Sequence, residues 1–329
     1  MIINNIDILK LNRPFLIAEA GSTHQGSPEL ALEMAKIAVE SGADALTFQE
    51  IDETKLYTEL DELPVLPQPR AGWECLKECK IIAKNSGLAF SVCVTDLDSL
   101  EKAMEIGIDF IKIVSYDIVF LPFLKYCGDT GLPILMSTGA STFDEVRKAI
   151  SAASASDRLL LYHADCGYPT KDHEVNLLRM LSLRNEFKLP VGYCDHTDHG
   201  LSCIAATALG ANAIEKHFIL DRKLGGTDYM VAMESIEIKD LFDNIKRIAI
   251  MQGSGTDQIE EGDLYRRNNL RRSIALKRKV NKGNIITEEG LTMLRPPIGL
   301  QWDEKDKIIG KKAKKDLSAR YIIKTDDLE

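Results

Sequence analysis

The sequence lacks any run of the roughly 18 to 20 apolar residues that a helix needs to cross a bilayer. Its first residues, MIINNIDILKLNRP, also lack the basic start, the apolar stretch and the cleavage site of a secretory signal. Positive charge is scarce, since 41 Lys and Arg against 50 Asp and Glu give a net charge of −9. These absences argue against a membrane protein and against a nucleic-acid or anionic-membrane partner, so we expect a cytoplasmic protein.

Paired cysteines are absent as well. The seven cysteines are odd in number and scattered, and Cys75 and Cys79 lie four residues apart in a helical pattern. No second pair gives the spacing of a zinc ribbon, and thiols stay reduced in the cytosol. We therefore expect free, mostly buried thiols rather than disulfides or a structural zinc site.

The first three-quarters of the chain alternates short apolar runs with amphipathic stretches. Each run is continuous and bounded by Gly, Pro, Asp or Asn, which is typical of strands covered on both faces. Eight such units in about 250 residues predict an α/β fold, the (β/α)8 TIM barrel. A doubly wound sheet is the rival, but its G-x-G-x-x-G fingerprint is missing after the first run. The expected strands are 15–21, 43–49, 88–94, 109–115, 133–139, 158–164, 190–196 and 212–218.

The character of the sequence changes after the eighth unit. Residues 253–269 are polar and show no apolar period, so we expect a linker there. Residues 270–329 carry short β-type runs around the turn NKGN, together with clusters of Lys and Arg. We predict a barrel domain over 1–252 and a small, basic, β-rich domain over 270–329.

Polar side chains gather at the carboxyl ends of the expected strands, where barrel enzymes place their chemistry. A charged group within an apolar run is costly to bury without a partner, so a whole set at one end indicates a polar site. The set is Glu19, Gln49, Lys112, Ser115, Ser137, Thr138, His163, Asp165, Asp195, His196, Glu215 and His217.

Two histidines, His196 and His217, come at the tips of neighbouring strands. Two imidazoles there could hold a divalent metal ion, with Asp195 orienting His196. The plainer interpretation is a hydrogen-bonded pair, or one catalytic histidine with a structural partner, and spacing alone leaves both open. Lys216 precedes His217 and should point to the opposite, outer face of its strand.

Lys112 also allows two interpretations. It is either a Schiff-base amine or an anchor for a phosphate or carboxylate, and the hydroxyls of Ser115 and Ser137 favour the anchor. The long segment 50–72 could act as a lid over such a site, or it is a plain surface loop.

Several motifs occur in one order along the chain: FLIAEAGSTHQG, FIKIVSYD, LPILMSTGAST, YPT, VGYCDHT, ANAIEKHF and LRRSIALKRKVNKGNIITEEGLTMLRPP. Together they resemble the sialic acid synthase family, which makes N-acetylneuraminate and the related legionaminic and pseudaminic acids. The similarity covers nearly the whole chain and includes a C-terminal antifreeze-like (SAF) domain. Several motifs in one order are far more specific than any one of them.

This resemblance implies a (β/α)8 barrel and an SAF domain, in a domain-swapped homodimer whose SAF domains cap the partner's sites. It implies condensation of phosphoenolpyruvate with an N-acylated amino sugar, an N-acyl-mannosamine-type aldehyde, to give a nonulosonic (nine-carbon, sialic-type) acid and phosphate. A divalent metal, Mn²⁺ or Mg²⁺, would polarise the aldehyde, because attack by the enol carbon builds alkoxide charge that a Lewis acid stabilises.

The resemblance also assigns roles to single residues. His196 in CDHT and His217 in EKHF match the family's metal ligands, and Glu19 in AEAG matches a carboxylate beside the reacting carbon. We expect Glu19, His217 and Lys112 to be catalytic. The expected substrate-binding residues are Gln49, Tyr168 and Asp228 for the sugar, Ser115 and Ser137 for the phosphate, and Arg295 of the SAF domain for the partner's sugar site.

The expected donor pocket departs from the family's usual pattern. Thr47 replaces a Lys, Cys194 a Ser, Cys166 an Asn or Ser, and the stretch around Cys93 replaces Ser-Thr-Pro-Phe. Losing a charged donor costs about 1.5–3 kcal/mol in a hydrogen bond, and thiols are weak donors. Two alternatives therefore stay open beside the synthase: a paralogue that uses a different donor, and a catalytically silent sugar-binding protein.

Overall fold

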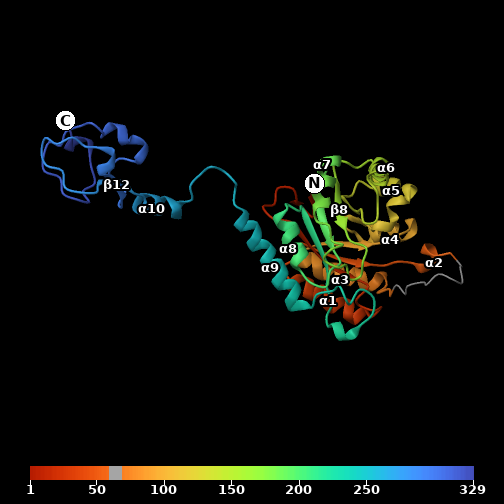
Figure 1. Ribbon diagram of the computed structural model, residues 1–329. Coiled ribbons are helices and arrows are strands. Elements are labelled where there is room, and N and C mark those ends of the chain that lie inside the picture. Colours follow the sequence, from red (N-terminus) through yellow and green to blue (C-terminus); the bar gives the residue numbers. More distant parts are fainter. Residues whose placement is uncertain (59–68) are drawn as a thin grey trace. The chain divides into compact units, whose positions relative to one another are not determined.

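The computed structural model describes residues 1–58 and 69–329 of the chain (Figure 1). It divides into two compact units, Met1–Gly253 and Ser254–Glu329. Much of the segment for which the sequence allowed a lid lies outside the described residues. In the described part of the chain, no helix has the length and apolar character needed to cross a membrane.

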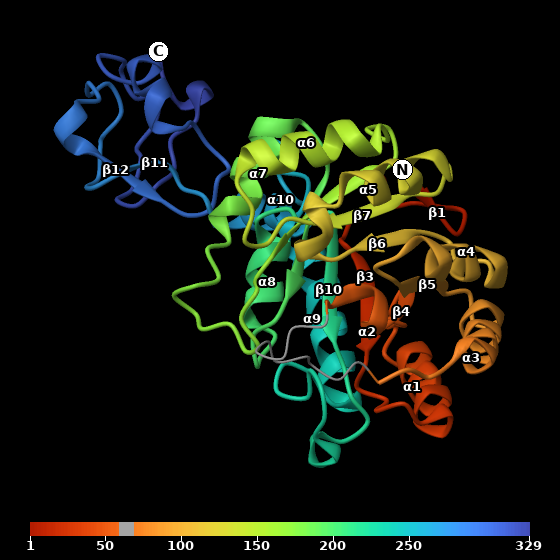
Figure 2. The same ribbon diagram turned by 90° about the vertical axis from the view of Figure 1, so that its right-hand side faces the viewer.

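The first unit is the predicted barrel. Its parallel strands pair in the order β5-β4-β3-β10-β9-β8-β7-β6, so the first strand of the barrel, β3, lies beside the last, β10 (Figure 2). β5 and β6 are at the two ends of this order, and two hydrogen bonds link β5 to the residues just before β6. The Asp109 N–H donates to the Phe90 carbonyl (2.8 Å), and Ser91 Oγ donates to the Phe110 carbonyl (2.6 Å). The strands are β3 (Phe15–Gly21), β4 (Ala45–Gln49), β5 (Ala89–Cys93), β6 (Ile111–Ile113), β7 (Ile134–Ser137), β8 (Leu159–Ala164), β9 (Val191–Asp195) and β10 (Ala213–His217).

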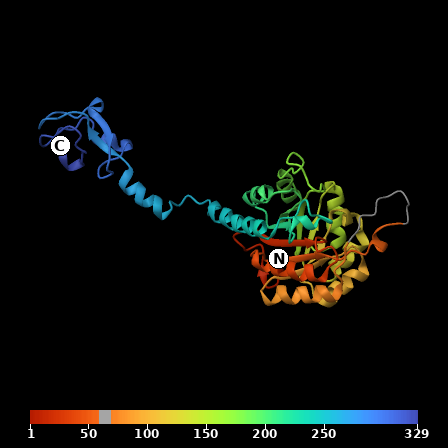
Figure 3. The same ribbon diagram turned by 90° about the horizontal axis from the view of Figure 1, so that it is seen from below.

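Helices lie around the outside of this sheet (Figures 2 and 3). Their starts follow local signals: Ser27 accepts the Leu30 N–H ahead of a proline at the first turn of α1, and Thr142 with Glu145 forms a capping box before α6. The helices of this unit are α1 (Pro28–Glu40), α2 (Glu53–Leu56), α3 (Trp73–Asn85), α4 (Leu97–Ile106), α5 (Leu121–Asp129), α6 (Phe143–Ala153), α7 (Leu178–Phe187), α8 (Leu201–Ala208) and α9 (Ser235–Gln252).

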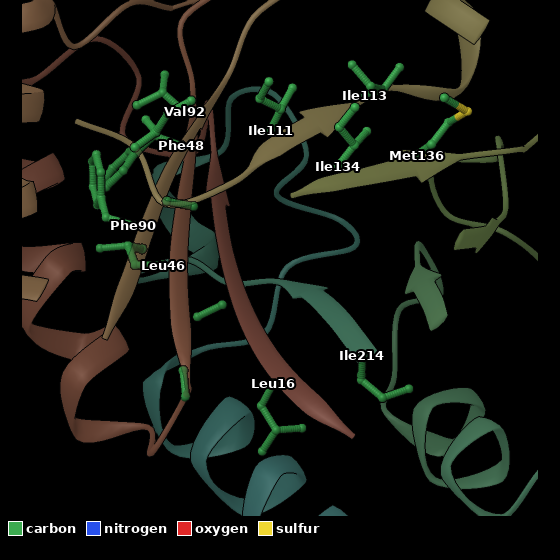
Figure 4. Close-up of a cluster of buried hydrophobic side chains, with 14 of the residues drawn as sticks. Leu16, Leu46, Phe48, Phe90, Val92, Ile111, Ile113, Ile134, Met136 and Ile214 are labelled. Carbon is green, nitrogen blue, oxygen red and sulfur yellow. The ribbon is translucent and has the colours of Figure 1, made fainter. Parts of the chain in front are cut away.

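Side chains alternate along each barrel strand between the interior and the layer beneath the helices. The outward apolar side chains belong to the main core and are drawn in Figure 4, among them Leu16, Leu46, Phe48, Phe90, Val92, Ile111, Ile113, Ile134, Met136 and Ile214. A second buried cluster fills the interior at the amino ends of the strands. It contains Phe15, Ile17, Ala45, Ala89, Leu135, Leu160 and Ala213, together with Ile3 and Ile8 from the hairpin of β1 (Ile2–Ile3) and β2 (Ile6–Asp7). The interior positions that carry polar side chains therefore lie at the carboxyl ends of the strands.

The second unit has its own core of small β elements, as expected. β11 (Ser273–Leu276) pairs antiparallel with β12 (Leu291–Leu294), and isolated bridges such as Val280 with Leu317 complete the framework. Buried side chains include Ile274, Ile286, Ile308 and Ile323. The segment expected to be a linker contains an exposed helix, α10 (Glu261–Leu270), before the first strand. Short 3-10 turns complete both units: η1 (Ser115–Val119), η2 (Arg222–Leu224), η3 (Glu288–Gly290), η4 (Trp302–Lys307) and η5 (Thr325–Asp327).

All seven cysteines are free, as the sequence predicted, and six of them are buried. Cys166 alone among them is partly exposed. It follows β8, at the carboxyl ends of the strands.

The contact between α5 and α6 yields a first prediction. A Cβ added at Gly128 would lie 1.7 Å from the backbone carbonyl oxygen of Ala153, so the two helices would have to move apart. We expect Gly128→Ala to lower the free energy of unfolding by about 1–3 kcal/mol, as overpacking does. Urea unfolding measures the change, and Ser151→Ala on the exposed side of α6 is the matched control. Equal stability of the two variants would contradict this packing.

Candidate active site

The alternation along the strands divides the predicted strand-end residues into two groups. The inward group occupies the upper interior of the barrel and comprises the predicted Glu19, Lys112, His196, Glu215 and His217. Thr47, Cys93 and Cys194 of the expected donor pocket lie among them, and all eight are buried. The outward group was wrongly assigned to the site. Thr138 donates to the Tyr162 carbonyl, His163 contacts the Val175 carbonyl, and Asp165 and Asp195 share the Tyr193 hydroxyl in the layer beneath the helices.

Glu19 is held by hydrogen bonds from two sides. Its Oε1 accepts the Gly21 N–H (2.6 Å), and its Oε2 accepts the hydroxyl of Thr47 on the neighbouring strand. Burial and the negative charge of Glu215 raise the pKa of Glu19 to about 7, although Lys112, Thr47 and Gly21 work in the opposite direction. A carboxyl group poised near neutral pH can both give and take a proton.

Lys112 lies at the centre of the inward group and is 5% exposed. Its ammonium group pairs with Glu215, lies 3.8 Å from Cys194 Sγ, and sits 5.0 Å above the centre of the Tyr162 ring. Burial alone would lower the pKa of Lys112, but the negative groups around it, Glu215 and Glu19 among them, raise its pKa above the ordinary value. A lysine that stays protonated is not a nucleophile, which favours the anion anchor over the Schiff base.

His196 and His217 come together at the ends of β9 and β10, with ring centroids 5.4 Å apart. The Nδ1–H of His196 donates to the Asp165 backbone carbonyl, which leaves Nε2 as the acceptor that faces the Tyr168 hydroxyl at 3.0 Å. Burial lowers the pKa of His196 to about 4, and burial followed by the nearby His196 lowers the pKa of His217. Both rings are therefore neutral at physiological pH.

Asp195, which we expected to orient His196, faces the other way. Its carboxylate pairs with Lys216 (2.5 Å) in the outer layer, and the group that fixes the His196 ring is the Asp165 carbonyl instead. The reason is the strand alternation, which turns consecutive residues to opposite faces. The same rule confirms the outward direction predicted for Lys216, which is fully buried there.

Tyr168 and Asp228 close the upper edge of the site. The Tyr168 ring stacks on His196 with centroids 4.2 Å apart. A Cβ at Gly21 would lie 3.1 Å from His217 Nδ1 and 3.2 Å from Asp228 Oδ2, so these two groups approach the same point of the backbone. Gly21 also has φ +53°, and the missing side chain makes room for both. Burial raises the pKa of Asp228 to about 6.

The remaining predicted residues lie in different surroundings. Ser115 Oγ accepts the Gly139 N–H (3.2 Å), and a Cβ at Gly139 would meet both Ser115 Oγ (2.7 Å) and Cys166 Sγ (2.6 Å). The ends of β6, β7 and β8 thus bring Ser115 and Cys166 together. Ser137 is buried at the end of β7, and Gln49 is half-buried at the end of β4. Arg295 belongs to the second unit, so its predicted role stays a prediction.

Sequence reasoning gave no role to two residues that shape the site. Glu215 holds Lys112 and accepts the thiol of Cys194 (3.1 Å), and Tyr162 lies beneath the ammonium group. Both residues were within expected strands, and Glu215 belonged to the expected polar set without a role of its own. Its inward parity, shared with His217, was the signal that it faces the site. Tyr162 gave no such signal, because a tyrosine in an apolar run is ordinarily core.

The two histidines fit the metal that the sequence led us to expect. Both are neutral, and His217 Nδ1 is buried and has no hydrogen-bond partner. In the part of the chain that the structure describes, no three His, Cys, Asp or Glu side chains form a complete metal site. A divalent ion held here would have these two imidazoles as its protein ligands, with water or substrate oxygens in the remaining positions.

The raised pKa of Glu19 gives a prediction about stability. Between pH 4.5, its ordinary pKa, and about 7, the folded chain keeps a proton that the unfolded chain releases, so stability falls as pH rises through this window. Glu19→Gln removes this dependence of the free energy of unfolding on pH. The resulting difference between the variant and the wild type reaches at most about 3 kcal/mol at pH 7 and above. Urea unfolding of both proteins from pH 4.5 to 8 measures it. Parallel curves would contradict the raised pKa.

Comparison with known proteins finds relatives that match nearly the whole chain. The chain is 35% identical to the N,N'-diacetyllegionaminic acid synthase of Legionella pneumophila over 96% of its own length and 94% of the relative's. It is 29% identical to the pseudaminic acid synthase of Helicobacter pylori, over 97% and 99% of the two chains. The crystal structure of an N-acetylneuraminic acid (sialic acid) synthetase from Leptospira borgpetersenii serovar Hardjo-bovis, in complex with citrate, superposes with a TM-score of 0.73. That superposition has 30% identity and covers 78% of this chain and 92% of the other.

Two family models match the chain in succession. The first, described as the NeuB family, matches residues 34–257, and the second, the SAF domain, matches residues 271–329. The first match covers more than half of the chain and includes seven of the eight strands of the barrel in full, from β4 to β10. The chain therefore belongs to the NeuB family and carries an SAF domain.

Proposed function

We propose that the protein condenses phosphoenolpyruvate with an N-acylated amino sugar in its aldehyde form and releases a nonulosonic acid and phosphate. The observation that carries this proposal is the meeting of one carboxyl group, one ammonium group and two neutral imidazoles at the carboxyl end of the barrel. Near-complete coverage of relatives named as legionaminic and pseudaminic acid synthases supports it. We propose no single acceptor sugar.

His196 and His217 would hold a divalent metal ion, Mn²⁺ or Mg²⁺. When bound, such an ion supplies a Lewis acid for the negative charge that develops on the aldehyde oxygen as the new carbon–carbon bond forms. The Asp165 carbonyl fixes the tautomer of His196, so that its Nε2 presents a lone pair to the site. The stacked Tyr168 ring limits the rotation of the imidazole, and its hydroxyl, which donates to Nε2 in this structure, would turn to the sugar when an ion takes its place.

Glu19 is suited to the proton transfers of the reaction. Its two oxygens are held by the Gly21 N–H and the Thr47 hydroxyl, so the carboxyl group has a fixed position on β3. With a pKa of about 7, it can take a proton from the water that adds to the former enol carbon, or return one to the sugar oxygen. The ammonium group of Lys112 would meet the negative charge of the donor.

A silent sugar-binding protein is a poorer account of the same residues. Burial of Glu19, Lys112 and Glu215 together costs free energy, and a protein that only binds a neutral sugar gains nothing from that cost. The shared position of these charges beside the two imidazoles supports catalysis instead.

A second candidate, a synthase with a different donor, is favoured by the charge balance of the interior. Lys112 is the only cation among the inward residues that the structure describes, and Glu215 already pairs with it while Glu19 lies nearby. Thr47, in place of the family's lysine, donates its hydroxyl to Glu19 and adds no charge. This arrangement is less favourable for a donor with several negative charges than a pocket with two lysines.

The proposed reaction predicts phosphate release. Purified protein with Mn²⁺, phosphoenolpyruvate and a panel of acetamido hexoses should release phosphate with at least one acceptor, and a chelator should stop it. We expect His217→Ala to lower kcat/KM more than a hundredfold, because it removes one of two metal ligands. His173→Ala, whose side chain is 77% exposed, should change nothing. A metal-loaded protein that releases no phosphate with any acceptor would contradict the proposal.

Replacing Thr47 distinguishes the two donors. Thr47→Lys restores an ammonium group beside Glu19 and should lower the KM for phosphoenolpyruvate about ten- to a hundredfold, the equivalent of one charged hydrogen bond. Thr47→Met introduces a side chain of similar length without the charge, and it should not lower the KM for phosphoenolpyruvate. An unchanged KM in the lysine variant would favour a different donor.

A further inference from the structure

The residues that immediately precede the two histidines form an ion pair. Asp195 precedes His196 and Lys216 precedes His217, and the two are opposite each other in the ladder between β9 and β10. Lys216 Nζ lies 2.5 Å from Asp195 Oδ2, and both side chains are 0% exposed. Because neighbouring residues of a strand face opposite ways, this pair lies directly behind the imidazoles, in the layer beneath the helices.

Further hydrogen bonds extend the pair to a third strand. Asp195 Oδ1 also accepts the hydroxyls of Ser202 on α8 (2.7 Å) and Tyr193 (2.8 Å). The Tyr193 oxygen lies 2.8 Å from Asp165 Oδ2 as well, and the backbone carbonyl of Asp165 accepts the Nδ1–H of His196. We call Asp165, Tyr193, Asp195 and Lys216 the outer network. The network contacts His196 through the hydrogen bond from its Nδ1–H to the Asp165 carbonyl. It is also joined to both histidines along the backbone, because Asp195 and Lys216 are their neighbours in the chain.

The rest of this layer contains one more titratable side chain among the described strand residues, His163 on β8, which contacts the Val175 carbonyl and lies 3.7 Å from Asp165. Apolar side chains occupy the outward positions near the carboxyl ends of the other strands: Ala20 on β3, Phe48 on β4, Val92 on β5, Ile113 on β6 and Met136 on β7. Stability therefore does not demand charges here, and a buried ion pair is often no more stabilising than apolar residues of the same volume. What an ion pair does supply is a fixed geometry, and here it lies behind the two proposed metal ligands.

We propose that the outer network is a positioning device that fixes the separation and orientation of His196 and His217, and thereby sets the affinity of the site for a divalent cation. This inference rests on the proposed function, since it takes the two histidines as metal ligands. Lys216 and Tyr193 are its positioning residues: neither faces the interior of the barrel, and both act through the strands that carry the imidazoles. Partners that orient metal-binding histidines commonly change affinity ten- to a hundredfold when they are replaced.

Lys216→Met tests the proposal because it keeps the length of the side chain and removes the charge. In the full-length chain we expect Mn²⁺ to bind about ten- to a hundredfold more weakly, measured by calorimetry and by the electron paramagnetic resonance signal of free Mn²⁺. The matched control is Arg13→Met. It breaks another ion pair, Arg13 with Asp44 (2.5 Å), which lies at the amino ends of β3 and β4. It should lower stability and leave Mn²⁺ affinity unchanged.

Tyr193→Phe keeps the test valid if Lys216→Met does not fold. It removes one hydroxyl that lies between Asp165 and Asp195, and it should also weaken Mn²⁺ binding while the chain stays folded. Folded variants that bind Mn²⁺ as tightly as the wild type would overturn the inference and leave the proposed function intact. An equal loss of affinity in Arg13→Met at equal loss of stability would overturn it too. Wild-type protein that binds no Mn²⁺ would overturn the metal site itself.

Discussion

The arrangement of the site depends on one constraint, the change of face from each residue of a strand to the next. In β9 and β10 it places Asp195 and Lys216 in the outer layer and Cys194, His196, Glu215 and His217 in the interior. Functional and supporting residues are therefore consecutive in the sequence and separated by the backbone in space. A shift of one residue in either strand would exchange the two sets, so the pairing that holds the register also determines which groups can react.

The same constraint explains how much could be predicted from the sequence. Strand positions, the barrel and the inward placement of Glu19, Lys112, His196 and His217 followed from apolar runs and from which end of a strand each residue occupies. The direction of Asp165, Asp195 and His163 did not, because proximity to a strand end does not determine which face of the strand a side chain occupies. The Lys112–Glu215 pair joins residues that are 103 apart along the chain, and no local sequence pattern predicts such a pair.

Charge balance distinguishes this interior from a simple anion-binding pocket. One ammonium group meets two carboxyl groups, and three cysteines, Cys93, Cys166 and Cys194, stand at or near the positions that line it. The carboxyl group of Glu19 responds by holding its proton to near neutrality. Burial is the main cause of this raised pKa and the negative charge of Glu215 the next, while Lys112 is the nearby cation that works against both.

The hairpin at the beginning of the chain has a further consequence. Ile3 and Ile8 join the apolar cluster that fills the amino end of the barrel, so apolar side chains close that end beneath the polar residues. A substrate that contacts Lys112 would therefore have to approach it from the carboxyl ends of the strands.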